Sequence, residues 1–268
     1  MKDSKAADDV TIALADFVAT VEISRPPHNF FDFDLIHALA NAFESLDRNS
    51  SCRAIVLAAQ GKSFCAGSNF GDADDLDSDG QVRNRPQGKG TVHLYTEAVR
   101  LFRTQKPIVA AVHGSAIGGG LGLALVADFR VTSPDARFSA NFTRLGIHPG
   151  FGLSVTLPDL IGKQNAALML YTGRRIKGDE ALRLGLADIL VPPDEVRLAA
   201  YRLAGEIAQS APLAVAATRA TLRQGLADRV RAAIDRELPE QTRLRKTQDF
   251  KEGVKATAER RQANFTAS

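Results

Sequence analysis

The stretch that decides the fold is PIVAAVHGSAIGGGLGLALV, residues 107–126, in which an apolar run leads to the triplet Gly118-Gly119-Gly120. Residues 107–112 are apolar and include β-branched side chains, which is typical of a buried strand. Residues 121–126 are again apolar and predict a helix that begins at the glycines. Such a turn leaves backbone N–H groups unpaired at the positive end of a helix, with no side chains in the way. The stretch therefore predicts a site that stabilises negative charge.

The spacing of the glycines excludes three common glycine-rich turns. A dinucleotide fingerprint requires G-x-G-x-x-G, but its third glycine would fall at Leu123 or Leu125. A phosphate loop requires lysine after its last glycine, and Leu121 stands there. A nucleophile elbow requires a serine between glycines at a fixed spacing, which this stretch does not supply. Taken alone, the triplet is equally consistent with a closely packed turn that binds nothing.

A second turn of small residues follows another predicted strand. Residues 54–59 are apolar, and they lead through residues 60–63 to Ala66-Gly67-Ser68. If the two strands are adjacent, an N–H group near Ser68 and one near Gly119 converge on a single oxygen atom. Two such donors form an oxyanion hole.

These two turns, together with other landmarks, resemble the crotonase superfamily of enoyl-CoA hydratases and isomerases. The other landmarks extend over nearly the whole chain: residues 25–29 (RPPHN), Ala127-Asp128, Arg137-Phe138, residues 145–150 (LGIHPG), Thr172-Gly173 and residues 181–188 (ALRLGLAD). The resemblance implies an α/β fold, a crotonase-type spiral of ββα units followed by a C-terminal helical trimerisation region. It also implies an acyl-CoA substrate, an enolate-like intermediate, and the N–H groups of Ser68 and Gly119 as the two donors to the thioester oxygen.

The acid and base of the typical hydratases are missing from this sequence. Those enzymes use two glutamates, and their positions here hold Gly122 and Phe142. Neither side chain can transfer a proton, so hydration by a glutamate pair is not expected. Hydrolysis, decarboxylation, C–C bond cleavage and related reactions that keep the oxyanion hole stay open. Gly122 and Phe142 also suggest an apolar acyl pocket that is roomier on one wall.

His148 is the first candidate for the missing acid or base. It lies in the loop Gly146 to Gly152, which carries acidic catalytic groups in other members of the superfamily, and imidazole suits proton transfer near neutral pH. The alternative is that His148 bonds a backbone carbonyl and holds the turn. His93 and Tyr95 come next, at the start of a helix expected to cover the pocket, although Tyr95 also fits the apolar face of that helix.

Other residues receive substrate-binding or structural roles. The substrate-binding candidates are Lys62, Ala66, Gly67, His93, Tyr95, Gly122, Phe142, Arg260 and Phe265. By resemblance, Arg260 would meet the 3′-phosphate of the nucleotide. Cys65 is interpreted as a small buried residue, because no neighbouring base or cation is evident. Asp128 is interpreted as a structural cap, and Glu97 is expected on the solvent side of its helix.

The remaining pattern predicts alternating strands and helices. A hairpin is expected between residues 10 and 23, followed by a helix over 35–46 with Asp32 or Asp34 as its N-cap. Strands at 54–59, 107–112 and 129–133 predict a largely parallel sheet. Residues 69–91 are acidic and rich in loop formers, and they favour a solvated loop over a calcium site. From residue 192 onward the chain is helical, and its arginines, Arg219 and Arg223 among them, are expected on a solvated face with Glu237.

Composition sets the outer bounds. With 268 residues, 44% hydrophobic and 24% charged, the chain is typical of a soluble enzyme, with a core domain at residues 1–191 and a helical oligomerisation region at 192–268. No signal peptide or membrane span is evident, so a cytoplasmic location is expected. Two cysteines and the absence of zinc-ligand spacing predict no disulfide framework, metal or cofactor beyond the coenzyme A of the substrate.

Three hypotheses follow for the function. The favoured one is an acyl-CoA enzyme with non-standard catalytic residues, assembled as a homotrimer or a dimer of trimers as the resemblance implies. The second is a non-catalytic CoA-binding subunit. The third, binding of RNA by the basic C-terminal helices, is least favoured because a net charge of +3 is small.

Overall fold

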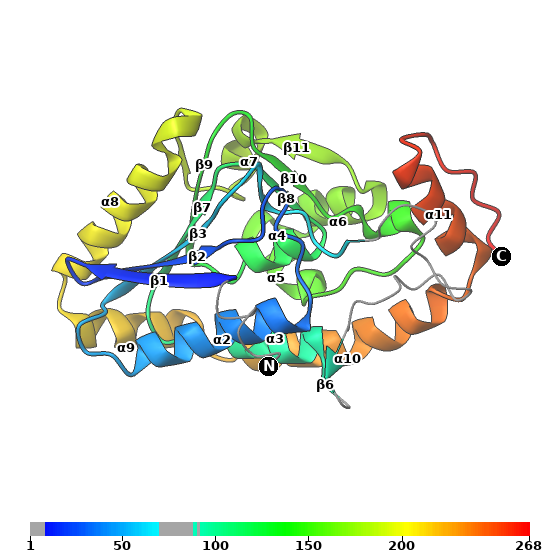
Figure 1. Cartoon of the computed structure of the whole chain (residues 1–268). Coiled ribbons are helices and arrows are strands. Elements are labelled where there is room, and N and C mark those ends of the chain that lie inside the picture. The colour runs from blue at the N-terminus through cyan, green and yellow to red at the C-terminus, as the bar shows by residue number, and fades with distance from the viewer. Residues whose placement is uncertain (1–8, 70–87, 90–91) are drawn as a thin grey trace.

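The computed structural model describes residues 9–69, 88–89 and 92–268, and Figure 1 shows how they are arranged. The strands are β1 (Val10–Ala15), β2 (Val18–Ile23), β3 (Ala54–Ala59), β4 (Ser63–Cys65), β5 (Gly88–Lys89), β6 (Val92–His93), β7 (Ile108–Val112), β8 (Ser115–Ile117), β9 (Phe129–Thr132), β10 (Arg137–Ser139), β11 (Arg175–Lys177) and β12 (Ile189–Leu190). The α-helices are α2 (Phe33–Asp47), α3 (Leu94–Phe102), α4 (Gly119–Ala124), α5 (Leu153–Ile161), α6 (Lys163–Thr172), α7 (Gly178–Leu184), α8 (Val196–Gln209), α9 (Pro212–Leu222), α10 (Leu226–Leu244) and α11 (Gln248–Ala258). The 3-10 helices among the described residues are η2 (Asn141–Leu145) and η3 (Pro193–Glu195).

The larger sheet has six strands in the order β1-β2-β3-β7-β9-β12. β1 and β2 pair antiparallel as the expected hairpin, and every other neighbouring pair in this sheet is parallel. Parallel neighbours need a crossover connection, and helices α3 and α4 lie within two of these crossovers. The predicted hairpin and the predicted, largely parallel sheet are both confirmed.

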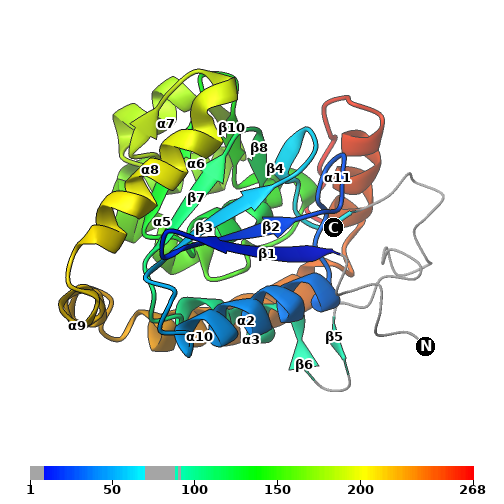
Figure 2. The ribbon, with the colours of Figure 1, turned by 60° about the vertical axis from the view of Figure 1, so that its left-hand side comes forward.

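Different helices cover the two faces of this sheet, because successive side chains of a strand point to opposite sides. In β3, Ile55 and Leu57 belong to the main core, which also includes residues of α2 and α3, whereas Val56 packs in a second cluster with Ala200 and Ala204 of α8. Figure 2 shows α8 on one side of the sheet and α2, α3 and α10 on the other. Burial on both faces explains why β3 and β7 are continuous apolar runs in the sequence.

A second sheet, in the order β11-β10-β8-β4, carries the two glycine turns. The sequence indicated that the turns follow β3 and β7, which are indeed adjacent. The structure adds two short strands, β4 and β8, between those strands and their turns. β4 and β8 pair parallel, so their carboxyl ends lie at the same edge of the second sheet. This edge brings the two turns together.

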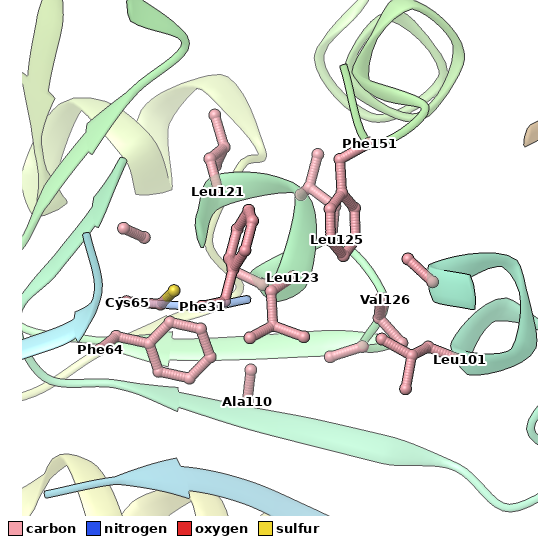
Figure 3. Close-up of a cluster of buried hydrophobic side chains, with 14 of the residues drawn as sticks. Phe31, Phe64, Cys65, Leu101, Ala110, Leu121, Leu123, Leu125, Val126 and Phe151 are labelled. Carbon is pink, nitrogen blue, oxygen red and sulfur yellow. The ribbon is translucent and has the colours of Figure 1, made fainter. Parts of the chain in front are cut away.

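Helix α4, which begins at the glycine triplet, is buried along its whole length. Figure 3 shows Leu121, Leu123 and Leu125 on different sides of this helix, with the rings of Phe31 and Phe151 beside it. The rings of Phe31 and Phe151 lie 5.8 Å apart between centroids. An apolar helix enclosed on all sides fits the apolar run of residues 121–126.

The C-terminal part is helical, as predicted, but its helices are packed to different extents. α8 lies against the large sheet, and α10 lies along α3 and α5. In α9 only Arg219 is buried, while Leu213 is 85% and Leu222 is 81% exposed. The boundary at residue 191 stays a prediction. The acidic stretch expected to form a loop lies mostly outside the described residues.

Candidate active site

The two turns that the sequence pairs as an oxyanion hole lie next to each other in the structure. Gly67, which follows β4, has φ +81°, and an ideal Cβ there would lie 2.7 Å from the carbonyl oxygen of Ile117 and 3.6 Å from the nitrogen of Gly119. Ser68 follows Gly67 directly in the chain. The backbones of both turns therefore approach within van der Waals distance, and only glycine permits the approach.

Gly119 is the first residue of α4, so its N–H group has no acceptor within the helix. Its lack of a side chain is required by packing, because an ideal Cβ would lie 2.2 Å from Cζ of Phe31. Gly120 is held as tightly, since its Cβ would lie 2.0 Å from the carbonyl oxygen of Cys65. The triplet is therefore both a closely packed turn and a source of backbone donors. The packed turn is shown, and the binding of negative charge there stays a prediction.

Phe151 fills the space beside Gly122. An ideal Cβ at Gly122 would lie 2.7 Å from Cδ1 of Phe151, whose ring is fully buried. Phe142 is buried as well, and its Cζ lies 3.8 Å from the ideal Cβ position of Gly118. The expectation of a roomier wall at Gly122 was wrong, because the aromatic side chain of Phe151 occupies the room that the glycine leaves. The residues around Gly122 are apolar and buried, and an apolar acyl pocket at this place stays a prediction.

His148 is half-buried and bonds the neighbouring backbone. Its Nδ1 lies 2.7 Å from the carbonyl oxygen of Pro149. A carbonyl oxygen only accepts, so Nδ1 carries a proton, and a neutral ring then presents Nε2 as an acceptor. This bond to a backbone carbonyl is the one expected if His148 only holds the turn. It also fixes the tautomer that a general base would need, and so both roles of His148 stay open.

His93 is the N-cap of helix α3. Its Nδ1 accepts the N–H of Tyr95 at 3.1 Å, and the two rings make an edge contact at 5.0 Å between centroids. Burial, assisted by the positive charge of Arg245, lowers the pKa of His93 to about 4. Tyr95 is buried against Phe151, as its position in the apolar face of the helix predicted, and burial raises the pKa of its hydroxyl.

Glu237 and Gln241 of α10 are fully buried polar residues next to this cluster. The expectation that Glu237 lies on a solvated face was wrong, and Gln241 was not singled out from the sequence. Gln241 donates from Nε2 to the carbonyl oxygen of His148 at 2.8 Å. Glu237 accepts the N–H of Gly152 at 2.9 Å. The spacing of four residues between them, in line with the buried Val230 and Ile234, is the signal that was available in the sequence.

The other predicted substrate-binding residues lie around these turns or far along the chain. Ala66 donates its N–H to the carbonyl oxygen of His28 at 3.0 Å, and Lys62 donates its N–H to that of Pro27 at 2.8 Å. Arg260 is exposed just after α11, and Phe265 is 43% exposed near the C-terminus. No hydrogen bond or ion pair joins either of these two residues to the glycine turns in the described part of the chain, and their binding roles stay predictions.

Two structural interpretations are supported. Cys65 is fully buried, and burial raises the pKa of its thiol to about 12, which rules out a ready thiolate nucleophile. Asp128 accepts the N–H of Ile108 at 2.8 Å and so caps the start of β7. Among the residues that the structure describes, no group of histidine, cysteine or carboxylate side chains is arranged to hold a metal ion, and no helix is long and apolar enough to cross a membrane.

Two other expectations about charged residues were wrong. Glu97 is buried rather than solvated, because α2 packs along α3 and His37 of α2 lies 2.7 Å from its carboxylate. Arg219 and Arg223 do not form a solvated face, because both turn inward and bind Asp128. Helical spacing shows which residues share a face, but it does not show what that face contacts.

Comparisons with known proteins agree with this architecture. The family model described as enoyl-CoA hydratase/isomerase matches residues 15–268. The crotonyl-CoA hydratase of Syntrophomonas wolfei is 32% identical over 263 residues, covering 97% of this chain and 98% of that protein. The carnitinyl-CoA dehydratase of Proteus mirabilis is 35% identical over 249 residues, covering 91% and 93%. The crystal structure of an enoyl-CoA hydratase/isomerase from Pseudoalteromonas atlantica superposes with a TM-score of 0.85 at 28% identity, over 96% of this chain and 100% of that one. The chain therefore belongs to the enoyl-CoA hydratase/isomerase family.

Proposed function

We propose that this protein is an enzyme that binds an acyl-CoA thioester and stabilises an enolate-like intermediate. In this proposal the N–H groups of Ser68 and Gly119 donate to the thioester oxygen, and their attraction strengthens as negative charge develops on that oxygen. The observation that carries the proposal is the close approach of Gly67 and Gly119 at the ends of β4 and β8. The names of the relatives, crotonyl-CoA hydratase and carnitinyl-CoA dehydratase, support a CoA thioester as substrate.

The reaction differs, in this proposal, from hydration by two glutamates. Gly122 and Phe142 cannot transfer protons, and the ring of Phe151 would obstruct even a small side chain at position 122. In this proposal the thioester would meet the aromatic surface of Phe142 and Phe151 on that side, and water is excluded there because both rings are buried. Such a surface favours proton removal or C–C bond cleavage next to the thioester carbonyl over attack by a water molecule held between two carboxylates.

His148 is the proposed acid or base. The bond from Nδ1 to the carbonyl oxygen of Pro149 orients the ring and leaves Nε2 to accept a proton. An imidazole held in one tautomer is a suitable proton carrier near neutral pH.

The first experiment separates binding from turnover. A panel of enoyl-, β-keto- and hydroxyacyl-CoA thioesters is assayed for conversion, and a saturated acyl-CoA is titrated by calorimetry. The infrared stretch of a ¹³C-labelled thioester carbonyl is expected at lower frequency in the complex than in water, because two N–H donors polarise the bond. Binding and a frequency shift without conversion of any thioester would favour the non-catalytic CoA-binding subunit. Absence of binding would refute both proposals.

The second experiment tests the two parts of the site with single substitutions. H148Q is expected to reduce turnover by about 10²- to 10⁴-fold, the usual contribution of a general acid or base, with unchanged affinity for a saturated acyl-CoA. G119A is expected to abolish the infrared shift, because its Cβ would displace the ring of Phe31. G205A is the matched control, since no atom lies within 4 Å of the ideal Cβ of Gly205 on α8.

The predicted homo-oligomer stays part of this proposal. Helix α9 buries only Arg219 and exposes Leu213 and Leu222 almost completely, which is unfavourable for a helix of an isolated chain. Light scattering coupled to size exclusion is expected to give a mass of three or six chains of 28.8 kDa. A monomer mass would contradict the assembly without affecting the proposed chemistry.

A further inference from the structure

Two side chains of helix α10 form hydrogen bonds with the two ends of the segment of residues 148–154. Gln241 donates from Nε2 to the carbonyl oxygen of His148 at 2.8 Å. Glu237, one helical turn earlier, accepts the N–H of Gly152 at 2.9 Å with one carboxylate oxygen. Its other oxygen accepts the N–H of Ser154 at 3.1 Å and the hydroxyl of Ser154 at 2.6 Å. The carboxylate therefore caps the first turn of α5 from a different helix.

The side chains of Glu237 and Gln241 are almost completely shielded from solvent, unlike the charged side chains of a protein surface. Glu237 is 0% and Gln241 is 2% exposed. A buried carboxylate is costly unless hydrogen bonds compensate it, and Glu237 has three donors. The contact is also close: an ideal Cβ at Gly150 would lie 2.6 Å from Nε2 of Gln241, and one at Gly152 would lie 2.8 Å from Cγ1 of Val230.

Phe151 lies between the two attachment points in a strained conformation. Its φ is +63°, a value that a side chain of this size rarely adopts. Such a conformation persists only where the surroundings enforce it. The ring is held against Gly122 and makes ring contacts with Phe31, Tyr95 and Phe102. The orientation of this ring therefore depends on a backbone segment that Glu237 and Gln241 fix on either side.

We propose that Glu237 and Gln241 are positioning residues that hold Phe151 against Gly122, and that they thereby set which acyl groups the site accepts. The inference rests on the proposed acyl-CoA function: Gly122 follows Gly119 by three residues in α4, so the ring of Phe151 packed against it lies beside the proposed thioester site. Neither residue touches the substrate in this proposal. Their effect passes through the backbone of residues 148–154.

The test compares affinities for two saturated thioesters, acetyl-CoA and octanoyl-CoA, measured by calorimetry. E237Q keeps the size of the side chain but replaces an acceptor oxygen by an NH₂ group that opposes backbone N–H groups. We expect E237Q to change the ratio of the two dissociation constants by about fivefold or more, in the same direction as F151A, because pocket walls discriminate chain length by factors of this order. D235N is the control, since Asp235 is an exposed residue of the same helix.

The ratio separates positioning from a purely structural role. A variant that only unfolds part of the sample lowers the binding stoichiometry for both ligands and leaves the ratio unchanged, and that result would overturn the inference. If the wild-type protein binds neither thioester, the proposed function fails instead.

A second measurement needs no ligand. The chain contains no tryptophan, so an F151W variant carries a single fluorophore at the position in question. Adding E237Q to F151W is expected to red-shift the emission and increase quenching by acrylamide, whereas adding D235N leaves both unchanged. Identical spectra for all three proteins would show that Glu237 does not hold residue 151.

Discussion

At the scale of single residues, Gly122 and Phe151 form a complementary pair. The glycine leaves a space, and a ring from a loop 29 positions later in the chain occupies it, as the distances of 2.7 to 2.8 Å from the ideal Cβ of Gly122 to Phe151 show. The sequence indicated the missing carboxylate at position 122 from the resemblance alone. It did not indicate the filled space, because that depends on where the loop folds back.

This pairing predicts a non-additive mutational effect. G122A alone is expected to lose about 1–3 kcal/mol of unfolding free energy by overpacking, and F151A alone about 3–5 kcal/mol by leaving a cavity. In G122A/F151A the added methyl group no longer meets the ring, so the double variant should be more stable than the sum of the single losses by about 1 kcal/mol or more. Urea unfolding of the four proteins measures this difference, and strictly additive losses would contradict the contact.

At the scale of elements, helix α3 begins with a histidine whose charge is suppressed. The folded-state pKa of His93 is about 4, below its ordinary value of 6.5, because of burial and the charge of Arg245. Between about pH 4 and pH 6.5, His93 therefore binds a proton in the unfolded chain but not in the folded chain. Stability contributed by neutral His93 is fully present above pH 6.5 and is lost as the pH falls toward 4.

The H93Q variant tests this linkage. Glutamine retains an acceptor for the N–H of Tyr95 but does not titrate. The wild-type protein is expected to lose more thermal stability than H93Q between about pH 7 and about pH 5, since only the wild type has the proton uptake on unfolding. Parallel melting temperatures across this range would mean that His93 is protonated as easily in the folded state as in the unfolded one.

Helix α10 shows why the sequence was insufficient at this scale. Its buried positions are Val230, Ile234, Glu237 and Gln241, which follow helical spacing, but two of the four are polar. The pattern was therefore interpreted as a solvated, charged face. A buried carboxylate is recognisable only when its donors are known, and those of Glu237 lie in residues 152–154, more than 80 positions away.

At the scale of the whole molecule, Asp128 joins the amino ends of strands β7 and β9 to the C-terminal helices. Its carboxylate accepts the N–H of Ile108, and it also binds Nε of Arg219 and Nη1 of Arg223, each at 2.9 Å. Arg219 is the single buried residue of α9. This ion pair therefore anchors a helix that has little other contact with the core.

Breaking this anchor is expected to destabilise the fold strongly. D128N leaves two largely buried guanidinium groups without their counterion, a change that typically costs about 3–5 kcal/mol. D235N, which removes the exposed partner of Arg231, is expected to cost less than about 1 kcal/mol. Urea unfolding at a fixed protein concentration compares the two, and similar losses would show that the Asp128 cluster is no stronger than a surface pair.

The sequence by itself determined the elements and the identity of the glycine turns. Alternating strands and helices, an N-cap at Asp32 or Asp34 and the turns at Gly67 and Gly119 depend on local periodicity and on backbone freedom, which neighbouring residues reveal; the structure selects Asp32. The triplet with its flanking apolar runs was sufficient to predict a strand, a turn and a buried helix in that order.

Only the tertiary structure decided how the site is enclosed. The placement of the two turns at one edge depends on β4 and β8, the filling of the space at Gly122 depends on Phe151, and the inward position of Arg219, Glu237 and Gln241 depends on segments distant in the chain. The physical reason is the same in each case. A polar or aromatic side chain takes its role from the groups that it meets, and those groups are brought to it by folding rather than by sequence proximity.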